Sequence, residues 1–176
     1  MNYDRFVGPA LCFDGYENIT PAFLREQGIE LLLTDLDFTL APKSVRHADE
    51  AVLSWLASLK ESGVQVMVLS NNRSGQRVVD FCAELGIPYV GRAGKPSKKG
   101  YLRACEKGGV GVEKTAMLGD KLLTDTLGAR RCGMLMLLVE PRGGAVTAWQ
   151  KVLYVLQEPF KRFCSNDQRA KRGAKR

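Results

Sequence analysis

IELLLTDLDFTL, at residues 29–40, is the stretch of sequence that decides the fold. Its first half, 29–34, is a short apolar run that stops abruptly at Asp35, and this length favours a buried strand over a helix. Asp37 follows two residues later, so the strand ends in a pair of aspartates. Taken alone, such a pair is explained equally well as a strand stop followed by a helix cap. Residues elsewhere in the chain therefore decide whether the two aspartates have a structural or a chemical role.

Outward from this stretch, short apolar runs alternate with segments of helical periodicity. Further strands are expected at 64–69, 88–90, 115–118 and 134–139. Helices are expected at 22–27, 46–62, 74–85, 98–107 and 124–131, and a last one from about residue 145. This alternation predicts an α/β fold, a Rossmann-like doubly wound parallel sheet with helices on both faces and right-handed crossovers.

The chain length and composition predict one soluble globular domain. At 176 residues, we expect an N-terminal segment (1–28) with a short helix packed on the core, a main domain (29–160) and a disordered tail (161–176). No apolar run approaches the roughly 18 residues that cross a bilayer, and the start lacks the pattern of a secretory signal. Five scattered cysteines and a single histidine argue against a zinc site and against a catalytic cysteine. The expected location is the cytoplasm.

The net charge of +7 is concentrated at the C-terminal end. Residues 161–176 hold seven lysines and arginines against one acidic residue, Asp167, so the rest of the chain is nearly neutral. A terminal basic run is usually a solvated end, but it can also contact anionic lipid or RNA.

Polar residues follow the other predicted strands as well. In parallel sheets ligands bind beyond the carboxyl ends of the strands, so these positions are where chemistry is expected. They are Ser70 and Asn71 after the second strand, Lys95 in the loop after the third, and Asp120 and Asp125 after the fourth. Several carboxylates without a histidine form a hard, oxygen-only site, which predicts Mg²⁺ as the cofactor.

Such a set supports phosphoryl transfer. Of two aspartates two residues apart, one can attack phosphorus while the other exchanges a proton with the leaving or attacking oxygen. Lys95, Ser70 and the metal ion are the groups available to balance the negative charge of the transferred phosphoryl group.

Four motifs in order resemble the haloacid dehalogenase superfamily. Residues 31–40 resemble its signature of a hydrophobic strand followed by D-x-D-x-T, 69–72 (LSNN) its second motif, Lys95-Pro96 its third, and 119–125 (GDKLLTD) its fourth. The resemblance implies roles for the residues at these positions. Asp35 would be the nucleophile, Asp37 the general acid and base, Asp120 a direct metal ligand beside Asp35 and the Asp37 carbonyl, Asp125 an outer-shell metal residue, Ser70 and Lys95 binders of the phosphoryl group, and Thr39 and Asn71 further substrate-binding residues.

A narrower resemblance, over about residues 8–158, is to the YqeG-like phosphatases. It rests on 19–24 (ITPAFL) and on 119–128 (GDKLLTDTLG). Relatives usually carry asparagine where Phe38 stands, and we expect this departure to alter substrate fit without abolishing activity.

The gaps between motifs suggest the class of substrate. Neither gap leaves room for a cap domain, so the site should be open and favour bulky or surface-bound phosphates. Proteins similar to this subgroup include phosphatidylglycerophosphate phosphatases, and 149–163 could form a basic amphipathic helix that lies on anionic lipid. The same segment could equally be an ordinary core helix.

Three functional hypotheses follow from the sequence. The leading one is a Mg²⁺-dependent phosphatase that hydrolyses phosphatidylglycerophosphate to phosphatidylglycerol as a peripheral membrane enzyme. The second keeps the chemistry but uses a soluble phosphate ester or a phosphoprotein. The third is a non-catalytic module that binds RNA or the ribosome through 169–176; the absence of interleaved aromatic residues there makes nucleic acid the weaker prediction.

Overall fold

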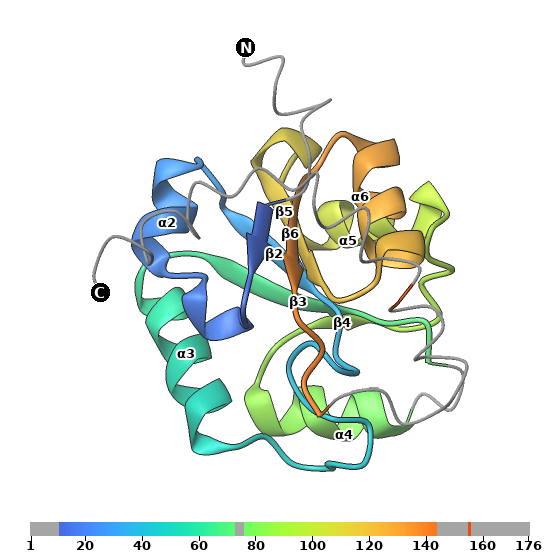
Figure 1. The fold of residues 1–176 in the computed structure, drawn as a ribbon. Coiled ribbons are helices and arrows are strands. Elements are labelled where there is room, and N and C mark those ends of the chain that lie inside the picture. Colours follow the sequence, from blue (N-terminus) through green and yellow to red (C-terminus); the bar gives the residue numbers. More distant parts are fainter. Residues whose placement is uncertain (1–10, 73–75, 144–154, 156–176) are drawn as a thin grey trace.

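A computed structural model describes residues 11–72, 76–143 and 155, and its centre is one parallel sheet. The strands are β1 (Leu11–Phe13), β2 (Leu31–Thr34), β3 (Gln65–Leu69), β4 (Tyr89–Val90), β5 (Thr115–Gly119) and β6 (Leu135–Val139). Their order in the sheet is β1-β6-β5-β2-β3-β4, and every pair is parallel (Figure 1). The predicted fold class is confirmed. The short edge strand β1 adds a sixth strand that the sequence pattern did not predict.

The helices follow the predicted alternation, with two differences at their beginnings. They are α2 (Pro21–Glu26), α3 (Glu50–Glu61), α4 (Gln76–Leu85), α5 (Lys98–Gly108) and α6 (Leu127–Cys132). The predicted start of the second helix at Arg46 is wrong, because the Asp49 carboxylate accepts the Val52 N–H at 2.9 Å and caps α3 there. The helix predicted to begin at Thr124 is present as α6 but begins at Leu127, because a π turn, η3 (Leu122–Thr126), precedes it. The helix predicted from about residue 145 and the basic tail lie outside the described residues.

Helices cover both faces of the sheet because the strand side chains alternate between two apolar clusters. Leu32, Val66 and Leu118 point to the cluster formed with α2, α3 and α4. Leu31, Leu33, Met67 and Met117 point to the cluster formed with α5 and α6. Figure 1 shows these helices on opposite sides of the sheet. The predicted doubly wound arrangement is therefore present.

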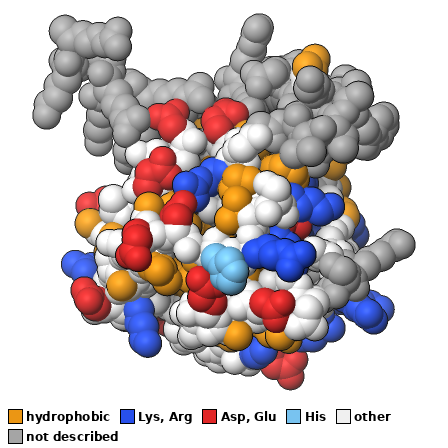
Figure 2. All heavy atoms as spheres, turned by 90° about the horizontal axis from the view of Figure 1, so that it is seen from below, with side chains coloured by type: hydrophobic (Ala, Val, Ile, Leu, Met, Phe, Trp, Pro, Cys, Tyr) orange, Lys and Arg blue, Asp and Glu red, His pale blue; other side chains and the backbone are white. Residues whose placement is uncertain are grey.

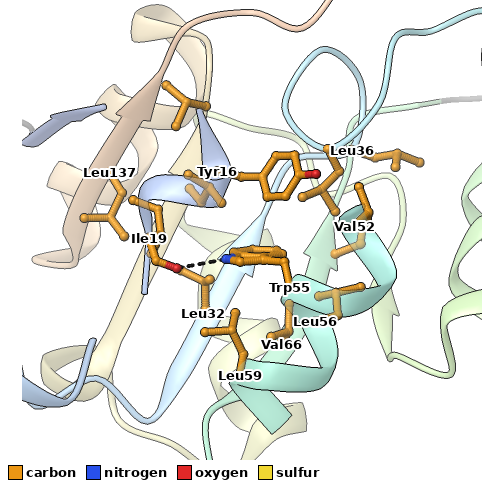
Figure 3. Packing of buried hydrophobic residues seen from close by; sticks show 14 of the residues in the cluster. Tyr16, Ile19, Leu32, Leu36, Val52, Trp55, Leu56, Leu59, Val66 and Leu137 are labelled. Atoms are coloured by element: carbon orange, nitrogen blue, oxygen red, sulfur yellow. Dashed lines mark hydrogen bonds between the residues drawn. The ribbon is translucent and has the colours of Figure 1, made fainter. Parts of the chain in front are cut away.

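The N-terminal segment is part of the first of these clusters. The Trp55 indole of α3 donates to the Ile19 carbonyl at 2.8 Å, and the Tyr16 ring lies edge-on to Trp55 at 4.9 Å between ring centres (Figure 3). Leu24 of α2 is fully buried. The indole hydrogen bond satisfies a buried donor, so this contact fixes the segment against α3 without an unpaired polar group.

The middle of the sheet is where the connections diverge. From β2 the chain proceeds to β3 on one side, and from β5 it proceeds to β6 on the other. Loops that separate in this way leave a crevice at the carboxyl ends of the two strands, which is the usual ligand site of such sheets. Among the described residues no separate cap domain lies between the strands, and no helix there is long and apolar enough to cross a membrane.

Candidate active site

Three buried carboxylates meet at the carboxyl ends of β2 and β5. These side chains, here called the carboxylate cluster, are Asp35, Asp120 and Asp125, and one oxygen from each lies within 4.8 Å of the others. The Asp35 N–H donates to the Leu118 carbonyl at 2.9 Å, so the two strands end side by side. A Cβ on Gly119 would stand 2.5 Å from the Asp125 carboxylate, so only glycine lets Asp125 fold back over the end of β5.

Lys95 is buried between two of these carboxylates. Its Nζ lies 2.8 Å from Asp125 Oδ1 and 3.1 Å from Asp35 Oδ1. Burial opposes the charge on Lys95, but Asp125 and Asp35 outweigh it and hold the pKa of Lys95 above its usual value. Lys95 is therefore an ammonium ion, as its predicted role of binding a phosphoryl group requires.

Asn71 holds the Lys95 backbone from both sides. The Asn71 amide donates to the Lys95 carbonyl at 2.9 Å, and the Lys95 N–H donates to Asn71 Oδ1 at 2.7 Å. The structure thus places Asn71, a predicted substrate-binding residue, where it positions Lys95. Ser70 is buried beside it, and its hydroxyl oxygen accepts the Asn72 N–H at 3.1 Å.

A second lysine, Lys121, enters the site and was given no role from the sequence. Its Nζ lies 2.6 Å from Asp120 Oδ1, 3.1 Å from Asp35 Oδ2 and 3.3 Å from the Asp37 carbonyl oxygen. The available signal was its place within the GDKLLTD motif, directly after Asp120. A lysine after a strand usually points to solvent, so only the turn at η3 shows where this one goes.

The oxygens around Lys121 fit a divalent cation. They are the oxygens of the three residues predicted as direct metal ligands, and Lys121 shows that they stabilise a positive charge at one point. All are hard oxygen donors, which suit Mg²⁺. Asp37 contributes its carbonyl here, whereas its carboxylate faces away toward Arg77.

Lys121→Met is expected to make divalent cations bind more tightly. The ammonium and the cation need the same oxygens, so removing the ammonium should raise the apparent Mg²⁺ affinity by about tenfold. Without metal, the variant should melt below the native protein, because the carboxylates then repel one another. Thermal melts in EDTA and across a Mg²⁺ titration measure both effects.

A Lys114→Met variant is the matched control for this measurement. Lys114 pairs with Glu30 on the surface, with about half of each side chain exposed. The melting point of the Lys114→Met protein should therefore match that of the native protein at every Mg²⁺ concentration. If Mg²⁺ raises the melting point of the Lys121→Met protein no more than that of the native protein, the Lys121 ammonium and the cation do not compete for the same oxygens.

The surroundings of Asp35 and Asp37 push their pKa values in opposite directions. Burial disfavours the charge on Asp35, but Lys95 and Lys121 outweigh it and hold the pKa of Asp35 below its usual value. Burial raises the pKa of Asp37 above its usual value, even though Arg77 Nη1 lies 2.9 Å from its Oδ1. An ionised carboxylate beside a carboxyl group that keeps its proton longer is the pairing that the predicted nucleophile and general acid require.

Thr39 and Phe38 complete the turn between these aspartates and α3. The Thr39 hydroxyl donates to Asp120 Oδ1 at 3.2 Å, so this predicted substrate-binding residue contacts the carboxylate cluster. Phe38 has a φ of 69°, a conformation that asparagine adopts more readily than phenylalanine. Its buried ring lies 5.6 Å from Lys121 Nζ. Phe38 therefore faces a lysine of the site and supplies no ligand atom.

Arg142 is a further residue that the sequence gave no reason to select. Its N–H donates to the Phe38 carbonyl at 2.7 Å, and its Nη1 donates to the Leu40 carbonyl at 2.6 Å. Arg142 thereby fixes the turn that carries Asp37. It follows β6, far from the motifs in sequence, so no local pattern could reveal this contact.

Comparison with known proteins shows the family to which the chain belongs. The model of the haloacid dehalogenase-like hydrolase family matches residues 4–133. "Probable phosphatase YqeG" of Bacillus subtilis is 38% identical over 124 residues, which cover 70% of this chain and 72% of that protein.

Solved structures resemble the fold at low sequence identity. The cobalt-bound deoxy-D-mannose-octulosonate 8-phosphate phosphatase of Haemophilus influenzae has a TM-score of 0.55 at 18% identity, covering 82% of this chain and 96% of its own. The 4-nitrophenylphosphatase of Thermotoga maritima has a TM-score of 0.51 at 17% identity, covering 70% of this chain and 90% of its own. These likenesses show the shared fold.

Proposed function

Since this chain belongs to the haloacid dehalogenase-like hydrolases and is a phosphatase of that family, we propose that it releases phosphate from a monoester through a phospho-aspartate on Asp35. One observation carries this proposal. The Asp35 carboxylate is buried and ionised between two ammonium groups, at the rim where Asp120 and Asp125 also converge. A buried nucleophile of this kind is held ready for attack without needing to shed water.

The chemistry proceeds in two displacements. A carboxylate oxygen of Asp35 attacks phosphorus, the bond from phosphorus to the ester oxygen breaks, and Asp37 gives that oxygen its proton. Asp37 then takes a proton from water, which attacks the phospho-aspartate and releases inorganic phosphate and free Asp35. Lys95 stabilises the negative charge on the phosphoryl oxygens in both steps.

Mg²⁺ is the proposed cofactor, held by Asp35, the Asp37 carbonyl and Asp120, with Asp125 in the outer shell. When bound, it would supply further positive charge to the phosphoryl oxygens. The carboxylate cluster supports this assignment because it gathers hard oxygen donors alone.

Phosphatidylglycerophosphate is the proposed substrate, with the enzyme acting from the cytoplasm at a membrane surface. Two features support a large substrate at a surface. The described residues hold no separate cap over the crevice, and the C-terminal sequence is basic with apolar residues at helical spacing. A soluble phosphate ester or a phosphoprotein is the alternative.

Phosphate release from phosphatidylglycerophosphate in vesicles, compared with an aryl phosphate, tests this proposal. With Mg²⁺ we expect kcat/KM on the lipid to exceed that on the aryl phosphate, and with EDTA we expect neither to react. Faster turnover of the aryl phosphate would remove the lipid assignment. No phosphate release from either compound in Mg²⁺ would remove the catalytic function and favour the RNA-binding hypothesis.

A further inference from the structure

A pocket of about 820 Å³ opens beside Asp37, outside the carboxylate cluster. Its walls are the loop after β2 and successive turns of α4, and we call it the basic pocket. It is lined by Lys43, Ser44, Arg46, His47, Gln76, Arg77, Asp80 and Glu84. The helix α4 lies at the bottom of Figure 1. Figure 2 shows the molecule from that side, and there the pale blue histidine lies among basic and acidic side chains. The volume is within the range of small-molecule sites.

Arg77 connects this pocket to the reaction centre. It lines the pocket, and its Nη1 lies 2.9 Å from Asp37 Oδ1. The same guanidinium donates to the carbonyls of Pro42 and Val45 at 2.9 and 2.8 Å, and so fastens the loop wall to α4. Because the general acid Asp37 must face the departing oxygen, the pocket lies on the side of the alcohol that leaves.

The loop wall of the pocket favours an anion, because residues 43–47 include Lys43 and Arg46 and no acidic side chain. The two acidic residues of the pocket lie on the α4 wall, where Gln76 donates to Asp80 at 2.7 Å and His47 lies 3.1 Å from Glu84. Lys43 and Arg46 are exposed, and within the part of the chain that the structure describes neither side chain has an ion pair. Lys43 is also near enough to Asp37 to act on its carboxyl group electrostatically.

We propose that the basic pocket binds a second anionic group, a phosphodiester or phosphate, on the leaving alcohol, through Lys43 and Arg46. The substrate class is then an alcohol that carries one phosphate monoester and a second phosphate group a few bonds away. This inference rests on the proposed phosphatase function and deepens it. The lipid substrate proposed above has this pattern, because its leaving alcohol carries a phosphodiester; a soluble bisphosphate shares the same chemistry.

A matched pair of soluble substrates isolates the second anion. Propyl phosphate and 1,3-propanediol bisphosphate differ only in the second phosphate, so the ratio of their kcat/KM values measures what the pocket contributes. The test variant is Lys43→Met with Arg46→Met, which keeps the apolar stems and removes two charges. The control is Lys60→Met with Arg25→Met, an equal charge change at two exposed residues that do not line the pocket.

The native protein should prefer the bisphosphate, and the pocket variant should lose about tenfold of that preference. Any effect of Lys43 on the Asp37 carboxyl group changes the rates on both substrates alike, so it cancels in their ratio. The control variant should keep both rates. Added salt should weaken the preference in the native protein, because exposed charges are screened. An equal loss on both substrates, or a native protein without any preference, would overturn the pocket's role while leaving the phosphatase function in place.

A binding measurement makes the result independent of turnover. In an Asp35→Asn background, calorimetry should show the bisphosphate binding about tenfold more weakly after the Lys43 and Arg46 changes, with propyl phosphate unaffected. Unchanged bisphosphate binding would overturn the proposal even if no substrate were hydrolysed. Vesicles of phosphatidylglycerophosphate then identify the source of the anion. If the Lys43 and Arg46 changes lower hydrolysis of the lipid as much as that of the soluble bisphosphate, the anion is a lipid phosphodiester. A loss confined to the soluble bisphosphate contradicts that source.

Discussion

Asp35→Asn is expected to lower kcat for phosphate monoesters by about a thousandfold or more, because the amide cannot form the phospho-aspartate. Asparagine has nearly the same shape as aspartate and keeps an oxygen toward Lys95 and the Leu36 N–H, which contact Asp35 at 3.1 and 3.0 Å. The variant should therefore fold. Initial rates of phosphate release, with circular dichroism melts on the same samples, measure both properties.

An Asp14→Asn variant provides the matched control for this prediction. Asp14 is exposed and precedes η1 (Tyr16–Asn18), and it takes no part in the carboxylate cluster. Its rates should equal those of the native protein. If the Asp35→Asn protein is folded and hydrolyses substrate at the native rate, Asp35 is not the nucleophile and the two-step chemistry fails.

Of the substitutions proposed for this protein, Lys95→Met should cause the largest loss of stability, about 3–5 kcal/mol in the free energy of unfolding at pH 8. The Lys95 side chain is 2% exposed, and its ammonium group pairs with both Asp35 and Asp125. Methionine fills a similar volume but leaves the Asp125 carboxylate without its cation. Urea denaturation in EDTA measures the change without any contribution from bound metal.

The loss should also become smaller as the pH falls. Burial raises the pKa of Asp125 to about 6 even with Lys95 opposing it, and removing Lys95 raises that pKa further. The folded variant then binds a proton that the unfolded chain does not hold, so its stability decreases as the pH rises through this range. The difference in the free energy of unfolding between the native protein and the Lys95→Met variant should be smaller at pH 5 than at pH 8.

Lys114→Met again serves as a control, since it removes an exposed lysine from a surface pair. It should unfold at nearly the native urea concentration at both pH values. A Lys95→Met protein as stable as this control would show that the buried lysine does not compensate the carboxylates.

The sequence predicted the fold well because the strands are apolar runs of distinct length. The runs before Asp35 and Asp120 are buried on both faces, and their short length excluded helices. Strand β1 escaped prediction because three residues are too few to show a pattern. The late start of α3 could have been found, since Asp49 is a favoured capping residue.

The candidate site was predictable where a residue lies directly after a strand. Asp35 and Asp120 directly follow β2 and β5, and the sequence placed both at the same edge of a parallel sheet; the structure adds that these two strands are neighbours. Lys121, Arg77 and Arg142 reach the site through a turn, a helix and a distant loop. Their positions depend on tertiary packing, and a single sequence contains no local pattern for that.

The central position of β2 and β5 in the sheet has a consequence for how this enzyme could change its specificity over evolution. The reactive groups stand on strands that have neighbours on both sides, so altering them disturbs the core. Residues 43–47 and the outer turns of α4 are exposed, where most replacements cost little stability. New leaving groups can therefore be accommodated by mutations in this exposed wall while the hydrolytic chemistry is inherited unaltered.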